Sequence, residues 1–521
     1  MKTMKNKYTV LFLSAALALG SCAKQLEIDP RQSIDAETAL TSKEAIDASI
    51  TAIYGRMKSA RWYGRDMITH PDALADNGYA TGSSNRLVAE SNNVFNNTFT
   101  TTIWTSGYAG INQLNLTLKA IAGGIPNATA ADVARWEGNL YFLRGMFYFD
   151  MMRVYAYIPG AVVASQDRGG VPLVLEGIED AGTALAFKPS RAPINDVYTQ
   201  IVKDFEAAES RLAASTSASA SGSAVATKTA AQAMLARVNL YRKDFTNAKK
   251  WADLVIAARP ITALASYVSG WRAEIHPETI FHIRFATNAE NIGVNESLQT
   301  SFTTIVTLPG LTSATGGFGD LVPTLDLLNV LGITLKGGNT NNNFLGPRSI
   351  DSLRSTDIRN RLYEPGTAGR TKGWIECTKF LGKNGFINLD NVPVIRASEM
   401  YLIRAEAAAV TGSPVFNEAN AIADLKALKA QRYEGYAGSA METADNALTG
   451  AALQAEILLQ NRLEFAFEGH RFFDLKRLGL PIVKGAPNPN APVSPTDARI
   501  LAPILQADVD GNPNLKQNFG Y

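Results

Sequence analysis

A cluster of charged residues near the C-terminus is the first candidate for catalysis, because two carboxyl groups can act as a general acid and a general base. The cluster consists of Arg462, Glu464, Glu468, Arg471, Asp474 and Arg477. On a helix these residues follow one another at spacings of mostly three and four, so opposite charges would alternate along one face. Because paired arginines keep carboxylates ionised, we expect structural ion pairs and no catalytic residue here. A hydrolase that uses two of these carboxylates remains the less favoured alternative.

Other catalytic and metal-binding signals are weak. The four histidines, His70, His276, His282 and His470, form no His-Glu-x-x-His motif and no close pair, and none adjoins a cysteine. The chain has neither a Gly-x-Ser-x-Gly elbow nor a Walker loop. Residues 508–511 (DVDG) begin like a calcium loop but lack the glutamate that would close it. We therefore expect no metal, no cofactor and no enzymatic activity.

Aromatic side chains on polar loops are the candidates for ligand binding, because a ring can stack on a sugar while Asn and Asp bond its hydroxyls. Trp62, Tyr63 and Tyr79 lie in such a segment, together with Asp76 and Asn77. We predict that these five residues form the ligand platform. Trp271 is a further candidate and Trp374 a weaker one, whereas the helical spacing around Trp104 and Trp136 places those two in the core.

The N-terminus has the pattern of a secreted lipoprotein. An apolar run at 9–19 follows three lysines and is too short to span a bilayer, but it suits a signal peptide. The run leads into Leu19-Gly20-Ser21-Cys22, which resembles a bacterial lipobox. We predict that Cys22 carries the lipid and is the first residue of the mature protein. The other cysteine, Cys377, then has no intrachain partner, and we expect it to be a small buried residue.

Composition excludes nucleic acid as a partner. The chain has 521 residues, is 46% hydrophobic and has a formal net charge of +2. Three of its lysines lie in the signal peptide, so the mature chain carries +2 − 3 = −1. No basic stripe that could follow a phosphate backbone is present.

Most of the chain has helical periodicity. Thr41 or Ser42 begins the first helix, and small residues in 229–258 and in 396–431 predict two antiparallel helix pairs of the tetratricopeptide kind. Further helices are expected at 103–122, 128–157, 193–212 and 451–478. Residues 71–101 and 213–227 are expected to be irregular. Residues 270–395 contain short β-type runs (IFHIRF, TTIVTL and VPVI) between loops such as 337–343.

Motifs along nearly the whole chain resemble the SusD/RagB family of outer-membrane lipoproteins of Bacteroidetes-type bacteria. The resemblance is carried by 141–155 (YFLRGMFYFDMMRVY), 394–407 (VIRASEMYLIRAEA), 461–479 (NRLEFAFEGHRFFDLKRLG) and 512–521 (NPNLKQNFGY), in the order that the family has them. Gly145, where the family usually has alanine, and an extra segment at 156–170 depart from the pattern. These two departures bear on the shape of the loops and not on membership of the family.

The resemblance implies a mostly α fold, in which a tetratricopeptide-like superhelix of helix pairs packs against a less regular subdomain with short strands and long loops. It divides the chain into a signal peptide (1–21), a lipidated tether (22–34), an N-terminal helical region (35–265) and a C-terminal region with the irregular subdomain and closing helices (266–521).

The resemblance also implies a function. The protein would be anchored by lipid at the outer-membrane surface, capture glycans and deliver them to a SusC-like TonB-dependent transporter. Peptide capture of the RagB kind is the alternative. Glycan preference rests on analogy with the family alone.

Overall fold

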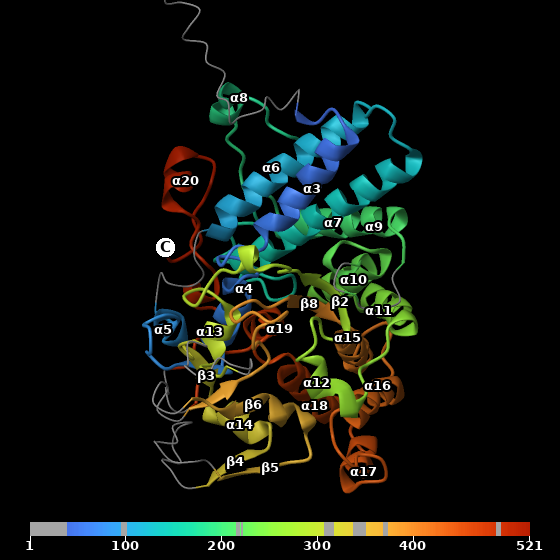
Figure 1. Cartoon of the computed structure of the whole chain (residues 1–521), viewed down its shortest axis with the longest axis vertical. Helices are drawn as coiled ribbons and strands as arrows, with labels where there is room; N and C mark the ends of the chain where they lie inside the picture. The colour runs from blue at the N-terminus through green and yellow to red at the C-terminus, as the bar shows by residue number, and fades with distance from the viewer. Residues whose placement is uncertain are drawn as a thin grey trace, which may run out of the picture.

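The computed structural model describes residues 39–94, 102–214, 219, 222–306, 317–336, 351–367, 374–485 and 491–521. Helices dominate it, as expected from the sequence (Figure 1). The N-terminal half contains α3 (Lys43–Arg56), α4 (Asp66–Leu74), α5 (Val88–Ser91), α6 (Thr102–Ala122), α7 (Ala130–Tyr155), α8 (Ala181–Ala186), α9 (Ile194–Arg211), α10 (Lys228–Tyr241) and α11 (Phe245–Ala258). The remainder contains α12 (Tyr267–Gly270), α13 (Leu298–Phe302), α14 (Leu325–Val330), α15 (Ala397–Ala409), α16 (Glu418–Ala430), α17 (Ala440–Asn446), α18 (Gly450–Phe465), α19 (Arg471–Leu478) and α20 (Gln506–Gly511). None of these helices is long and apolar enough to cross a membrane.

Side chains cap the starts of three helices in the N-terminal half, α3, α7 and α10. Ser42 accepts a hydrogen bond from the amide of Ala45 and starts α3, as predicted. Thr129 and Asp132 form a reciprocal capping box at the start of α7. Thr227 accepts a hydrogen bond from the amide of Ala230 and starts α10. Each cap satisfies amide groups that have no partner within the helix, so these residues set where the helices begin.

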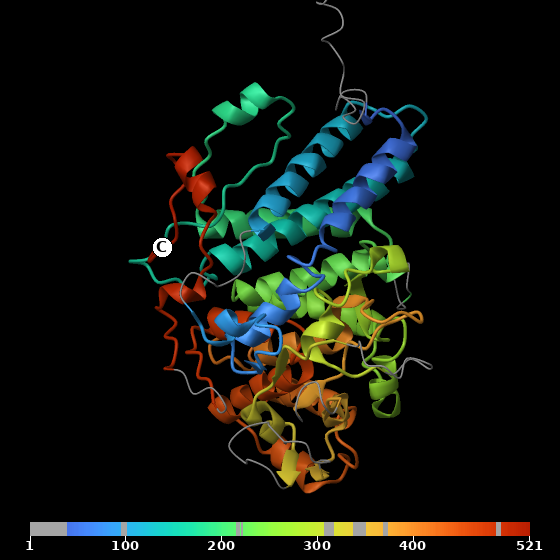
Figure 2. The same cartoon turned by 60° about the vertical axis from the view of Figure 1, so that its left-hand side comes forward.

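The helices stack one against the next in a superhelix. α3 packs on α6, α6 on α7 and α7 on α9, and the stack continues through α10, α11, α15 and α16 (Figures 1 and 2). The two predicted helix pairs are confirmed as α10 with α11 and α15 with α16. Alanines such as Ala233, Ala252 and Ala405 are fully buried along these helices, where a small side chain lets the backbones approach closely.

Within the described residues, the less regular part contains four two-stranded antiparallel sheets. They pair β1 (Gly78–Ala80) with β3 (Leu321–Pro323), β2 (Thr279–Ile283) with β8 (Val392–Arg396), β4 (Ile333–Lys336) with β5 (Asp351–Arg354), and β6 (Tyr363–Pro365) with β7 (Ile375–Cys377). The predicted runs IFHIRF and VPVI are confirmed as the paired strands β2 and β8. The prediction of a strand at TTIVTL is wrong for residues 303–306, which are irregular, and the rest of that run and the 337–343 loop lie outside the described residues.

One large hydrophobic core joins the helical stack to the sheets, and a smaller one lies among α15, α16 and α18. Trp104 and Trp136 belong to the large core, as predicted. Cys377 is buried and unpaired, and burial raises the pKa of its thiol to about 12. The thiol is therefore neutral and packs as a small apolar side chain.

The predicted helix at 451–478 is interrupted. α18 ends at Phe465, and the chain turns through Phe467 and Gly469, both at positive φ, before α19 begins. The carboxylate of Asp72 accepts hydrogen bonds from the amides of Phe467 and Gly469, both 3.1 Å long. A Cβ at Gly469 would lie 2.2 Å from the carbonyl oxygen of Met67, so this turn requires glycine.

Because of this turn, the predicted ion-pair ladder along one helix face is wrong. Only Asp474 and Arg477 pair as expected, at 2.8 Å. The other members reach distant segments: Arg462 and Arg471 bind Asp76, Glu464 binds Arg396 and Arg432, and Glu468 binds Lys379 and Arg396. All six residues do form ion pairs, but the pairs join elements that are far apart in the sequence.

Arg396 lies at the centre of a buried charge cluster, which we call the Arg396 cluster and which consists of Glu278, Arg359, Arg396, Arg432, Glu464 and Glu468. The Arg396 guanidinium lies within 3.0 Å of all three glutamates. Burial would raise the pKa of Glu464, but Arg432 and Arg396 outweigh burial and hold it well below its usual range. Arg432 and Arg396 also outweigh burial at Glu278 and lower its pKa to about 2. These carboxylates therefore stay ionised, and each needs its arginines.

We expect the replacement Arg432→Met to destabilise the fold strongly. Arg432 is completely buried and bonds both Glu464 and Glu278, so its loss leaves buried negative charge without compensation. The expected loss in unfolding free energy is about 3–5 kcal/mol, measurable by chemical denaturation. Arg361→Met is the matched control, because Arg361 pairs with Glu434 on the exposed surface. The control should change stability by at most about 0.5 kcal/mol, and equal effects of the two replacements would contradict the assignment.

Candidate functional site

The predicted ligand platform is mostly inside the protein. Trp62 and Tyr63 are 1% and 3% exposed, and both donate hydrogen bonds to the carboxylate of Asp150 on α7, over 2.8 Å and 3.1 Å. The segment after them is the helix α4, in which every residue is buried. The prediction of an exposed loop was therefore wrong, because its polar residues are bonded within the core and its aromatic rings turn inward.

Asp76 and Asn77 are also engaged within the protein. Arg471 donates two hydrogen bonds to the Asp76 carboxylate, at 2.7 Å and 2.8 Å, and Arg462 donates to the side-chain oxygen of Asn77. Burial would raise the pKa of Asp76, but Arg471 and Arg462 hold it below its usual value. These two residues connect the start of β1 to the C-terminal helices. Free polar side chains for a ligand were expected here, and that expectation is corrected.

Trp271 is 2% exposed and lies against the Arg396 cluster. The ammonium of Lys379 is 5.0 Å and the guanidinium of Arg396 is 5.4 Å from its ring. A ring in this position stabilises buried cations and has no face left for a ligand. The prediction of an exposed Trp271 was therefore wrong.

Tyr79 is the one member of the predicted platform that reaches the surface. It is half-buried on β1, and its ring lies 5.4 Å from that of Trp374, which directly precedes β7 and is also half-buried. The two rings are tilted by 43°. β3 brings them together, because it pairs with β1 and packs against β7. The sequence marked both residues as candidates but gave no sign that they form a pair.

A polar cavity of about 260 Å³ opens beside the loop that follows β1. Arg61, Arg65, Asn85, Arg86 and Glu90 contribute its polar lining. Sequence reasoning missed the arginines and Asn85. Arg61 and Arg65, which flank Trp62 and Tyr63 in the sequence, were a signal, but Arg86 joins them only because α4 and α5 pack together.

Ion pairs fix two of these arginines. Arg65 bonds Asp66 at 2.7 Å and also pairs with Glu296, and Arg86 bonds Asp320 at 3.1 Å. The Arg86 guanidinium lies 4.9 Å from the ring of Phe318. Its Nη2 atom is buried and has no hydrogen-bond partner among the described residues.

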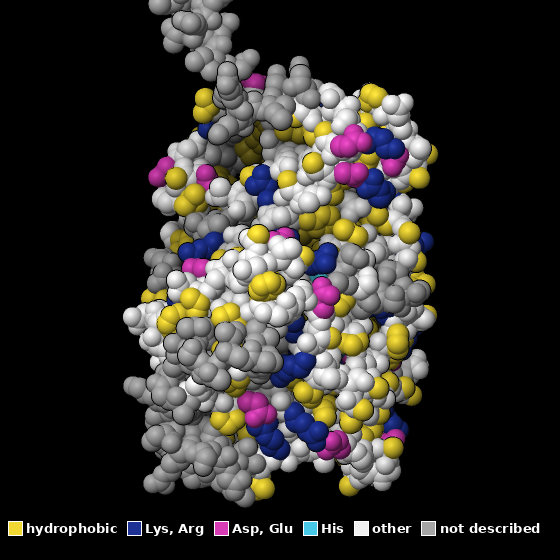
Figure 3. Space-filling model, in the orientation of Figure 1, with side chains coloured by type: hydrophobic (Ala, Val, Ile, Leu, Met, Phe, Trp, Pro, Cys, Tyr) yellow, Lys and Arg dark blue, Asp and Glu magenta, His cyan; other side chains and the backbone are white. Residues whose placement is uncertain are grey.

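Together, Tyr79, Trp374 and the cavity form what we call the β1 region. Its chemistry is that of a binding site: aromatic rings, fixed donors and one amide side chain. Within the described residues, no group of three or more His, Cys, Asp or Glu side chains is arranged to hold a metal ion. On the face shown in Figure 3, positive and negative side chains are interspersed and no broad area of one sign is visible.

Lys484 ties together the two helices that frame this cavity. Its ammonium donates to the carbonyl oxygens of Ala73, at the end of α4, and of Ser91, at the end of α5. Burial lowers the pKa of Lys484 to about 7, against partial compensation from Asp76 and Glu90. The position of α5 therefore depends on a lysine that changes its charge near neutral pH.

Comparisons with known proteins identify related chains. A family model described as "Starch-binding associating with outer membrane" matches residues 25–240, and a model described as "SusD family" matches residues 353–521. The SusD-like proteins P2 and P38 of Formosa agariphila are each 25% identical to this chain. The alignment with P2 covers 98% of this chain and 99% of P2. The alignment with P38 covers the whole of both chains.

Solved structures share the fold. A SusD superfamily protein from Bacteroides thetaiotaomicron superposes with a TM-score of 0.74 at 23% identity, over 92% of this chain and 99% of its own. A structure described as a laminarin-binding SusD-like protein superposes with a TM-score of 0.64 at 19% identity, over 92% of this chain and 100% of its own. At these identities the structures establish the fold of the chain.

We expect Lys484 to make stability depend on pH above neutrality. The pKa of Lys484 is about 7 in the folded chain and 10.5 in the unfolded chain. Between these two pH values, Lys484 carries a proton in the unfolded chain that it has released in the folded chain. The unfolding free energy of the wild type, relative to Lys484→Met, should therefore rise with pH, by at most about 1.4 kcal/mol per pH unit. Denaturation of both proteins across this range measures the difference. Parallel pH profiles would show that Lys484 does not titrate there.

Proposed function

The chain belongs to the SusD/RagB family, and from this premise we propose that it binds glycans at the cell surface and passes them to a SusC-like TonB-dependent outer-membrane transporter. The family models are described by starch binding and by association with the outer membrane, and one structural neighbour is described as binding laminarin. These descriptions favour a carbohydrate over a peptide ligand.

The observation that carries the proposal is the half-buried ring pair of Tyr79 and Trp374 at the β1 region. A sugar ring has apolar C–H faces and a polar rim, so its binding needs an aromatic surface and nearby hydrogen-bonding groups. The arginines and Asn85 of the neighbouring cavity supply such groups.

We propose binding without catalysis. Glu464 and Glu468, which the sequence offered as a possible acid–base pair, are fully engaged by arginine and lysine side chains inside the protein. Glu464 is 0% exposed, so a substrate cannot reach it. A carboxylate whose pKa lies well below its usual range also cannot donate a proton at neutral pH.

The cell-surface location rests on the lipobox, which lies outside the described residues. If Cys22 carries a lipid, Cys22→Ala should move the protein from the membrane fraction to the soluble envelope fraction, because a polar tether alone has no affinity for the bilayer. Fractionation with immunoblotting measures the shift, and globomycin treatment of the wild type should reproduce the processing defect. Unchanged membrane partitioning under both conditions would refute the anchor.

Trp374→Ala and Tyr79→Ala should each weaken glycan binding about ten- to a hundredfold, because each removes one central stacking contact. The measurement is calorimetry with the best ligand from a glycan array that includes laminarin. Phe416→Ala is the matched control, since Phe416 is 45% exposed and lies between α15 and α16, away from β1.

Three results would contradict parts of this proposal. Wild-type affinity in both aromatic variants, with circular dichroism confirming their fold, would place the glycan site elsewhere. Binding to a peptide pool but to no glycan on the array would favour the peptide alternative. Release of reducing ends from a bound glycan would identify a hydrolase.

A further inference from the structure

A second, larger cavity lies at the end of the molecule formed by α6, α8 and α20, away from the β1 region (Figure 1). Its volume is about 620 Å³, within the range of roughly 300–1,000 Å³ that ligand sites occupy. On the face shown in Figure 3, the surface near this end is hollowed and hydrophobic side chains are visible inside. The glycan proposal for the β1 region makes no use of this space.

The cavity is roofed by residues 172–189, which we call the arch. The helix α8 in the arch has no buried residue, and Leu185 and Phe187 are 74% and 41% exposed. The arch therefore stands clear of the helical body (Figure 2), and the cavity lies between the arch, α6 and α20. An element that buries none of its own side chains gains little from packing, so its position must be fixed by other contacts.

Hydrogen bonds fix the arch at both ends. At its start, Tyr108 on α6 donates to the carbonyl of Pro172, and Asn112 exchanges two hydrogen bonds with the backbone of Ile178. At its end, Lys188 donates to the carbonyl of Gly511 over 2.7 Å, and Asn512 donates to the carbonyl of Pro189. The cavity is thus held open before any ligand arrives, which lowers the cost of binding.

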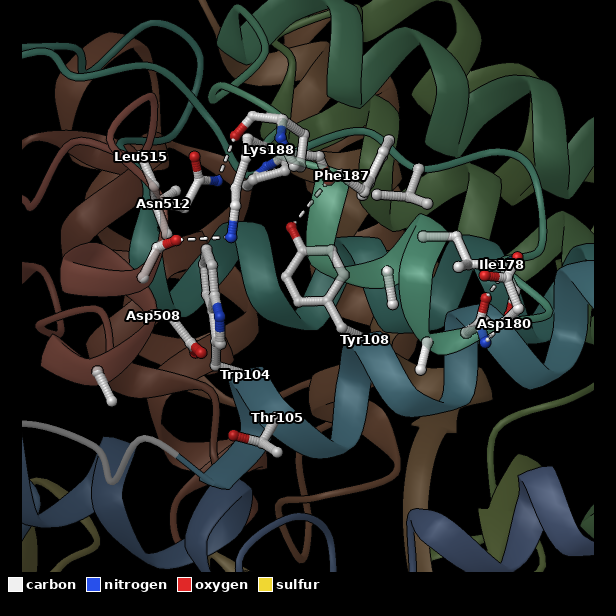
Figure 4. A pocket seen from close by; sticks show the side chains of 18 of the residues that line it. Trp104, Thr105, Tyr108, Ile178, Asp180, Phe187, Lys188, Asp508, Asn512 and Leu515 are labelled. Carbon is white, nitrogen blue, oxygen red and sulfur yellow. Dashed lines mark hydrogen bonds between the residues drawn. The ribbon is translucent and has the colours of Figure 1, made fainter.

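The interior of the cavity combines aromatic rings with one donor and one acceptor. The rings of Trp104 and Tyr108 lie 5.0 Å apart on α6, and Phe187 faces the same space from the arch. In the view of Figure 4, the ammonium of Lys188 and the carboxylate of Asp508 lie toward opposite ends of the Trp104 side chain. Among the described residues, the Asp508 carboxylate has no hydrogen-bond or ion-pair partner, and Lys188 uses one of its protons on Gly511.

This combination selects among ligand classes. An acyl chain would cover the Asp508 carboxylate without bonding it, which is costly, and Lys188 disfavours a cation. A second anion would be repelled by Asp508. A sugar ring satisfies all groups, because its C–H face packs on aromatic rings while hydroxyls donate to the carboxylate and accept from the ammonium.

We propose that the cavity beneath the arch is a second saccharide site, which takes a hexose ring of a neutral glycan independently of the β1 region. The inference rests on the proposed glycan-binding function but names a different place and different residues. Two sites on one protein would hold a long glycan by two of its parts, or two glycan chains at once, and thereby prolong its residence at the surface.

The six tryptophans of the chain allow both sites to be observed in one experiment. The protein is isotope-labelled at its indole nitrogens and titrated with methyl glycosides of glucose, galactose and mannose. The indole signal of Trp104 is assigned by Trp→Phe replacement. We expect at least one glycoside to bind with millimolar affinity and to shift this signal. Trp62, Trp136 and Trp271 line neither cavity, so their signals serve as internal references.

Variants then test the residues of the cavity. Asp508→Asn and Phe187→Ala should each weaken the Trp104 response about tenfold and leave the melting temperature unchanged, because both side chains are at least partly exposed. Asp510→Asn is the matched control on the same helix, since Asp510 does not line the cavity. Trp374→Ala should leave the Trp104 response unchanged.

The two proposals fail separately in this experiment. A Trp374 response without a Trp104 response would overturn the second site and keep the first. A Trp104 response that Asp508→Asn and Phe187→Ala do not weaken would also overturn it, because the ligand would then act from outside the cavity. A Trp104 response without a Trp374 response would keep the cavity and contradict the β1 region, and no response at either tryptophan would overturn both.

Discussion

The buried contacts of Arg396 constrain the rest of this structure. A guanidinium without exposure to water is tolerated only while carboxylates surround it, and here Glu278 does so from one segment and Glu464 and Glu468 from another. The end of β8, the segment before β2 and the end of α18 must therefore meet at one point. Hydrophobic contact could bring these elements together in several arrangements, whereas the requirement for paired charge selects one.

The same constraint reaches the candidate site through the turn between α18 and α19. Asp72 on α4 binds that turn, and Arg471 just after it binds Asp76 before β1. Asp76 and Asn77, the polar groups first attributed to ligand binding, thus connect the C-terminal helices to the start of β1. Tyr79 is carried on the strand that this connection positions, so its pairing with Trp374 depends on contacts deep inside the protein.

The two cavities differ in how the fold holds them. The cavity near β1 is lined by arginines that ion pairs fix, and it lies close to the charged interior. The cavity beneath the arch is held by uncharged donors and backbone carbonyls, apart from Lys188. Salt should therefore affect the surroundings of the first cavity more than those of the second. Rigid frames around both cavities are consistent with binding sites that exist before the ligand arrives.

The sequence by itself determined the long helices α3, α6, α7 and α9, the two helix pairs, two of the strands and the family, because 3.6-residue periodicity, caps and ordered motifs are local signals. It also marked Tyr79 and Trp374 as candidates. Only the tertiary structure decided which aromatic rings reach the surface: Trp62, Tyr63 and Trp271 have the same loop-like neighbours as Tyr79, yet they are buried. It likewise decided that the charged residues at 462–477 pair with distant partners. Burial and ion pairing depend on segments hundreds of residues apart meeting in space, which no local pattern contains.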